Sequence, residues 1–125
     1  MKRLWLLAAL VASPAAYAYT PDELRGDCQA AEEMYAQQKS SDPFKSIRSA
    51  RCIAYVAGFA DGYAVSNYLA EQVSVKLNAF CLPNDPDLSM RLVRAVTIHV
   101  ERVPPNTTMS TATLVAGALA KAFPC

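Results

Sequence analysis

The chain has 125 residues and is close to electrically neutral, with 12 lysines and arginines against 11 aspartates and glutamates. This balance gives no basic surface of the kind that nucleic-acid binding or an anionic membrane requires. The length suits one domain and excludes a second domain of ordinary size.

Residues 1–18 have the three parts of a secretory signal peptide. Lys2 and Arg3 form a basic start, an apolar run follows, and Ala16-Tyr17-Ala18 is an A-x-A cleavage site. The apolar run, about 9 residues long, is too short to span a bilayer. We therefore expect export to the periplasm, cleavage after Ala18 and a single mature domain of residues 19–125 with no membrane association. Removal of Lys2 and Arg3 takes the 12 basic residues to 10, which leaves a net charge of about −1.

The first predicted helix begins at Thr20-Pro21-Asp22-Glu23. This tetrapeptide has the residues of a capping box, with proline in the first turn. The helix should reach about Lys39, and the spacing of its apolar residues places Cys28 on the inward face. Ser40-Ser41-Asp42-Pro43 then breaks the pattern.

A second helix is predicted from Phe44 or Lys45 to about Tyr68, or as far as Lys76. One stripe along it carries mostly small residues, namely Ala50, Ala54, Gly58, Asp61 and Gly62. Glycine costs a helix about 1 kcal/mol relative to alanine, so the two glycines predict the close approach of another backbone. We expect Asp61 to have a partner such as Arg48, Arg51 or a tyrosine hydroxyl, or to face a subunit boundary.

Two shorter helices should follow. Asp85 and Pro86 are typical of a helix start, and this third helix should run to about Arg102 with His99 on its inward side. Val103-Pro104-Pro105-Asn106 ends it, and Thr107 or Thr108 can cap a fourth helix reaching about Ala122. Asn106-Thr107-Thr108 also matches a glycosylation sequon, but we interpret it as this cap. No segment alternates as a strand would.

Four cysteines lie in the mature region. An exported context and an even count favour two disulfides, and the gaps of 24, 29 and 44 residues are too wide for a zinc cluster. If consecutive helices run up and down, Cys28 and Cys52 lie near one turn, and Cys81 and Cys125 lie at the opposite end. We therefore predict the pairs Cys28–Cys52 and Cys81–Cys125. The predicted fold is all-α, a compact antiparallel bundle of about four helices clamped by two disulfides.

Catalytic groups are scarce. His99 is the one histidine, no serine or free cysteine can be assigned to it, and two disulfides would leave no thiol. We therefore expect a protein that binds a partner and is not an enzyme, with no metal and no cofactor.

With these residues laid out, the chain resembles the Rap/Tai family of periplasmic immunity proteins, which protect bacteria against type VI secretion amidase toxins. The resemblance spans nearly the whole mature chain and rests on four segments. They are Cys28, then Cys52-x-x-Tyr55-x-x-Gly58-x-x-Asp61, then Phe80-Cys81-Leu82-Pro83, and the ending Phe123-Pro124-Cys125. His99-Val100 departs from the family, where an aromatic residue and a leucine are more frequent.

This resemblance implies a helical homodimer that blocks the active-site cleft of a secreted peptidoglycan amidase. Toxin-contacting residues vary within the family. We predict them in the stretch Tyr68 to Lys76 and the loop Leu82 to Asp87, which helix packing leaves unexplained: Tyr68, Gln72, Lys76, Asn84 and Asp85. The alternative is a small periplasmic chaperone of the acid-resistance type, which would bind many unfolded clients.

Overall fold

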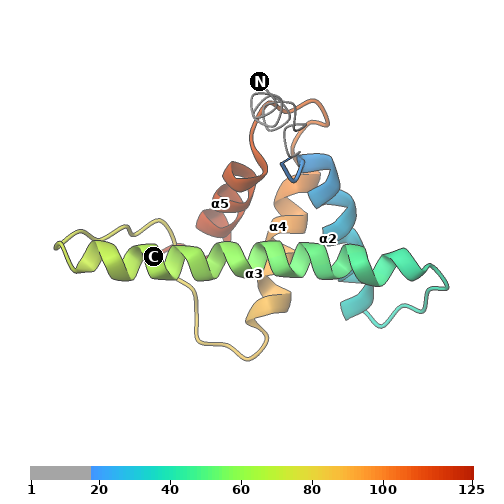
Figure 1. Cartoon of the computed structure of the whole chain (residues 1–125), viewed down its shortest axis with the longest axis horizontal. Coiled ribbons are helices and arrows are strands. Elements are labelled where there is room, and N and C mark those ends of the chain that lie inside the picture. Colours follow the sequence, from blue (N-terminus) through green and yellow to red (C-terminus); the bar gives the residue numbers. More distant parts are fainter. Residues whose placement is uncertain (1–17) are drawn as a thin grey trace, which may run out of the picture.

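The computed structural model describes residues 18–125 and contains four helices, with no strand in that range. They are α2 (Pro21–Tyr35), α3 (Pro43–Glu71), α4 (Leu88–Glu101) and α5 (Thr111–Ala122). The predicted signal peptide lies outside the described residues except for Ala18. In Figure 1, α3 is a long rod that crosses the other helices and projects beyond them at both ends. The all-α class, the four helices and both disulfides are confirmed.

The starts of α2 and α3 follow from side-chain caps. The Thr20 hydroxyl accepts a hydrogen bond from the Glu23 amide at 3.2 Å, as the capping box predicts. The Asp42 carboxylate caps α3 by accepting from the Phe44 amide at 2.9 Å. The first helix ends at Tyr35 and does not reach Lys39, because Gln37 takes a left-handed φ of 58°.

The predicted starts of the last two helices are wrong by a few residues. Asp85 does not cap α4 directly, because its carboxylate accepts from the Asp87 amide at 2.8 Å and closes a turn before the helix begins at Leu88. Thr107 and Thr108 do not cap α5. The Thr107 hydroxyl closes a local turn on the Met109 amide, and Ser110 provides the cap by accepting from the Thr113 amide.

The hydrophobic core lies where α2, α4 and α5 meet the middle of α3. α2 packs most extensively on α3, and α4 packs on both α2 and α5. The largest apolar side chains that are fully buried are Leu24, Val56, Val93, Val96, Val100, Leu114, Val115 and Leu119, and Phe80 and Phe123 are nearly so. The fully buried positions of α3 end at Ala60, and the partly buried Tyr63 is the last apolar residue of that helix to pack against the core.

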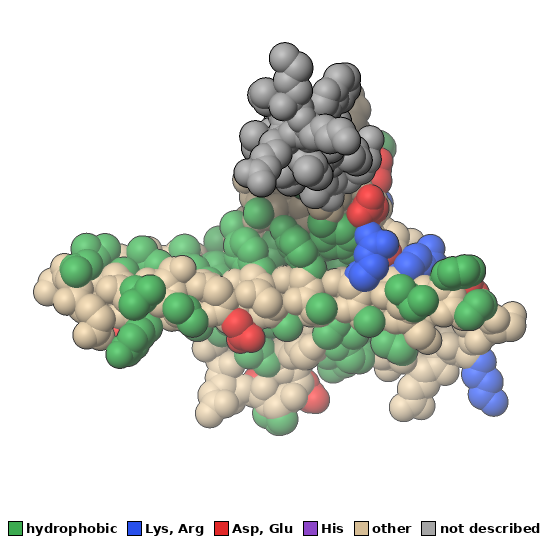
Figure 2. Space-filling view, viewed as in Figure 1, with side chains coloured by type: hydrophobic (Ala, Val, Ile, Leu, Met, Phe, Trp, Pro, Cys, Tyr) green, Lys and Arg blue, Asp and Glu red, His purple; other side chains and the backbone are tan. Residues whose placement is uncertain are grey.

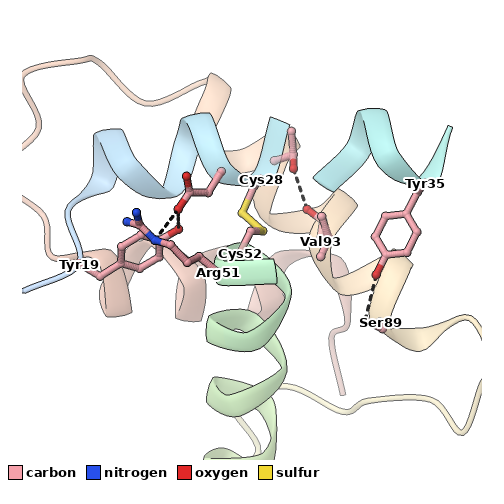
Figure 3. Close-up of a disulfide and its surroundings, with 9 residues drawn as sticks. Tyr19, Cys28, Tyr35, Arg51, Cys52, Ser89 and Val93 are labelled. Carbon is pink, nitrogen blue, oxygen red and sulfur yellow. Dashed lines mark hydrogen bonds and ion pairs between the residues drawn. A yellow bond between two sulfur atoms is a disulfide. The ribbon is translucent and has the colours of Figure 1, made fainter. Parts of the chain in front are cut away.

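Both predicted disulfides form, in different surroundings. Cys28–Cys52 joins α2 to α3 and is buried, with both residues at most 1 % exposed (Figure 3). Cys81–Cys125 is exposed and ties the segment after α3 to the end of the chain. The Cys81 amide also donates to the Phe123 carbonyl at 2.8 Å. The first bridge therefore belongs to the core, and the second anchors a surface loop.

A buried acid lies beside the first bridge, and it is Asp27 and not Asp61. Asp27 is 3 % exposed, and its carboxylate accepts from the Tyr19 hydroxyl at 2.7 Å and pairs with the Arg51 Nε at 3.1 Å. Arg51 also lies over the Tyr19 ring, as Figure 3 shows. Burial, followed by the hydrogen bond to Asp27, raises the pKa of Tyr19 above its ordinary value. The Tyr19 carbonyl accepts from Thr111, so this residue links α2, α3 and α5.

We predict that Asp27→Ala lowers the free energy of unfolding by about 1–3 kcal/mol, because the half-buried Tyr19 hydroxyl loses its acceptor. Asp61→Ala, which removes an exposed carboxylate from a helix, should cost nothing. Urea unfolding of the two variants measures the difference, and equal losses would show that the Tyr19–Asp27–Arg51 cluster does not stabilise the fold.

Removing each disulfide by double alanine substitution separates loop entropy from packing. Cys81–Cys125 closes the longer loop, of 44 against 24 residues. In the chain-entropy account its removal should therefore lower the free energy of unfolding by about 0.5 kcal/mol more than removal of Cys28–Cys52. Each buried sulfur removed from Cys28–Cys52 costs about 1 kcal/mol in packing. We therefore expect the Cys28→Ala/Cys52→Ala variant to have the lower melting temperature, and the reverse order would show that entropy dominates.

Candidate partner-binding surface

Exposed apolar side chains gather at the far end of α3 and in the loop that follows it. Figure 2 shows hydrophobic groups along this projecting end of the molecule. Tyr68 is 62 % exposed and Val73 is 71 % exposed. We call the whole set the apolar tip: Val65, Tyr68, Leu69, Val73, Val75 and Leu77. These six are more than half of the eleven large hydrophobic residues exposed in the described part of the chain, so the surface is a specific feature of this end.

The length of α3 accounts for the tip. α3 has 29 residues, whereas the helices that pack on it have 15, 14 and 12. A rise of about 1.5 Å per residue carries the last turns of α3 past its neighbours. Apolar residues in those turns therefore have no partner within the described chain.

The loop after α3 is folded into a defined shape. Ser74 and Asn78 have φ values of 61° and 50°, a left-handed conformation that is uncommon for serine and better tolerated by asparagine. The Val75 amide donates back to the Ala70 carbonyl at 3.0 Å. The loop thus extends the end of α3 as a folded cap.

The return of this loop to the core is fixed by an aromatic pair. The Ala79 amide donates to the Tyr63 hydroxyl at 2.9 Å, and the buried Phe80 ring stacks on Tyr63 with the centroids 3.9 Å apart. The Cys81–Cys125 bridge follows directly. Both ends of the loop are therefore held, which lowers the ordering entropy that binding would cost.

The predicted contact residues fall into two groups. Tyr68, Gln72 and Lys76 are all exposed and lie in or beside the apolar tip. Asn84 and Asp85 lie beyond the Cys81 bridge, in the segment that leads away from the end of α3 to α4 (Figure 1). The structure therefore brings the first three together and does not join the other two to them.

Asp85 is already engaged within the chain. Its carboxylate pairs with Arg91 at 2.7 Å and accepts from the Asp87 amide. The hydrogen bond from Asp87, followed by that from Arg91, lowers the pKa of Asp85 below its ordinary value. This residue shapes the turn before α4, and a contact with a partner stays a prediction.

Most of the apolar tip lies in the predicted stretch from Tyr68 to Lys76, although Tyr68 is the only tip residue among the five contacts predicted by name. Val65 and Leu77 lie outside that stretch. Their signal was the recurrence of apolar residues among polar ones from 65 to 77, which continues past the end of the helix.

A second exposed surface runs along the middle of α3. We call it the small-residue face: Ala50, Ala54, Gly58, Asp61 and Gly62, all exposed. A methyl group placed on either glycine would meet nothing within 4 Å. The close backbone approach expected at these glycines is therefore not made within the described chain.

The expected intrachain partner of Asp61 is not found either. Arg51 pairs with Asp27 and Glu23, and no described tyrosine or Arg48 contacts the Asp61 carboxylate. A position at a subunit boundary remains as the other expectation for this residue.

Residues 18–125 contain no group of three histidine, cysteine or acidic side chains placed to hold a metal ion. Every described cysteine is in a disulfide. Among the helices of this part of the chain, none has the length and apolar character needed to cross a bilayer.

Comparison with known proteins gives one family. The pattern of the Rap1a immunity proteins matches residues 20–125, which include all four helices, both disulfides, the apolar tip and the small-residue face. No curated protein and no solved structure matches the chain. The family resemblance inferred from the cysteine, glycine and aromatic spacing is thereby confirmed, and the chain belongs to the family of Rap1a immunity proteins.

Proposed function

We propose that this immunity protein acts in the periplasm and inhibits a peptidoglycan amidase delivered by type VI secretion, by covering the active site of that toxin. Membership of the Rap1a family supports the immunity role. The amidase target and the covering mechanism are our proposal. The observation that carries it is the apolar tip, a preformed projection without a partner in the described chain.

The shape and chemistry of the tip suit an enzyme cleft. Active sites are concave and mostly apolar, so a narrow projecting knob can enter one where a flat surface cannot. Tyr68 is the residue type that most often dominates binding energy at interfaces, and aliphatic neighbours such as Leu69 and Val73 exclude water around it. An inhibitor of this kind needs no reactive group, because it acts by occupying space.

The small-residue face supports a homodimer as the second part of the proposal. Two helices can approach closely only where side chains are small, and a two-fold axis would set this face against itself. Close packing in a dimer would then explain why Gly58 and Gly62, which destabilise an isolated helix, occur on this face. Asp61 would lie at the boundary between the two copies.

The alternative of a periplasmic chaperone would use the same apolar tip for unfolded clients. The family assignment favours the immunity protein, because it implies one cognate toxin.

We expect Tyr68→Ala to weaken toxin binding by about 30-fold or more, because hot-spot residues contribute about 2 kcal/mol or more. The measurement is titration calorimetry with a type VI secretion amidase against which the unchanged protein protects cells, together with survival of cells that express that amidase in the periplasm. Phe44→Ala is the matched control, since Phe44 is also exposed, at 66 %, but lies at the opposite end of α3. If cells survived with the Tyr68→Ala variant but not with the Phe44→Ala control, the toxin would bind away from the apolar tip.

Large side chains introduced on the small-residue face test the proposed dimer. Gly58→Leu/Gly62→Leu should leave the fold intact, since there is room for both side chains and leucine is a better helix former. We expect the variant to sediment as a monomer where the unchanged protein sediments as a dimer. Ala120→Leu, a similar addition at an exposed position of α5, should leave the dimer unchanged. A dimer that tolerates leucine at both glycines would refute this interface.

A further inference from the structure

A small hollow lies between α4 and α5, away from both surfaces described above. It has a volume of about 190 Å³. Its apolar wall is formed by alanines on both helices and by the exposed Ile98. The remaining lining residues are His99, Arg102 and Lys121. No acidic side chain lines it.

These three basic side chains have no partner among the described residues. Among the described residues, Arg25, Lys45, Arg51, Arg91 and Arg94 pair with acids, whereas the exposed Lys39, Arg48 and Lys76 do not. Neither a hydrogen bond nor an ion pair joins the side chains of His99, Arg102 or Lys121 to any described group. Arg102 and Lys121 are exposed and His99 is partly buried, and what sets them apart is that all three donors line one apolar hollow.

The position of the imidazole is fixed by a glycine on the facing helix. A methyl group on Gly117 would come within 3.3 Å of the His99 Nε2. Glycine in the interior of α5 costs about 1 kcal/mol relative to alanine, and here it admits the edge of the histidine ring. The wall of the hollow is therefore built by residues from both helices.

Helix polarity explains only part of this arrangement. Arg102 follows the end of α4, and Lys121 lies in the last turn of α5, where cations are favourable. That effect acts on each residue separately. It does not explain why both cations line one hollow with an apolar wall, or why His99 joins them.

We propose that this hollow binds the C-terminal carboxylate of a peptide whose last residue has a small apolar side chain. The carboxylate accepts hydrogen bonds from Arg102 and Lys121, and charge-assisted bonds of this kind are the stronger class. The side chain of the last residue lies against the alanines and Ile98, and the hollow of about 190 Å³, which the carboxylate shares, favours a small one. His99 donates from the wall. This site is independent of the proposed toxin surface.

The chemistry is shared by two sources, and the stereochemistry of the last residue distinguishes them. A protein C-terminus ends in an L-residue, whereas bacterial cell-wall peptides end in D-alanine. The probes are therefore acetyl-L-Ala-L-Ala and acetyl-D-Ala-D-Ala, each also made as the C-terminal amide. Binding is followed by NMR titration of the whole mature chain, through the His99 ring protons and the backbone amides of Ala118 and Lys121.

We expect at least one free-acid peptide to shift these signals saturably. The matching amide should bind at least about tenfold more weakly, because it lacks the charge. Arg102→Gln/Lys121→Gln should weaken binding by at least about tenfold. Arg48→Gln, which removes an exposed cation from α3, should leave it unchanged.

Preference for the D-peptide would assign the site to cell-wall ends, and preference for the L-peptide would assign it to protein ends. Equal binding of acid and amide, unchanged binding by the double variant, or no saturable shift up to about 5 mM peptide would overturn the proposal. Gly117→Val is a second test: it should displace the imidazole and weaken binding while the melting curve stays cooperative.

Discussion

The rest of the structure depends on the clamp between α2 and α3. The buried Cys28–Cys52 bridge and the Asp27–Arg51 ion pair join the two helices within one turn of each other. A covalent bond and an ion pair between the buried Asp27 carboxylate and the half-exposed Arg51 hold that part of α3 on the core. Since α3 is about twice as long as α2, fixing it there forces its far end into solvent.

The clamp that stabilises the core therefore also leaves the far end of α3 exposed. A helix held only by weak surface contacts would fray where its partners end. Here the far end is stiffened by the loop that folds back on it, by the Tyr63–Phe80 stack and by the Cys81–Cys125 bridge. The result is an apolar projection that keeps its shape without a partner. Such an exposed patch is a liability for a free protein and is best explained by a partner that covers it.

Much of the fold could be predicted because the relevant signals are local. The capping box at Thr20, the prolines and the 3.6-residue period located the four helices. The cysteine pairing followed from helix order, because only neighbouring ends can be bridged without moving the backbone. The errors at Asp85 and at Thr107 arose where several adjacent residues could each cap a helix, and tertiary packing chose among them.

The surface was harder to predict because burial is not a local property. Asp61 stands on an apolar helix, so it looked like a buried acid, whereas the polar segment around Asp27 gave no sign of burial. The face of α3 that carries Asp61 has no partner within the described chain, while Tyr19 folds back over Asp27 from the segment before α2. For the same reason only part of the apolar tip was found. A periodic pattern shows that Val65 and Leu69 share a helix face, but not that this face meets solvent.

Hydrogen exchange of the immunity protein, alone and bound to the amidase that we propose as its target, tests the central claim most directly. If the stiffened end of α3 enters the toxin's active site, the strongest added protection should fall on residues 65–79, with little change on the first turns of α3. Protection centred on residues 43–54, or none at the tip in a complex that still inhibits the enzyme, would contradict the account.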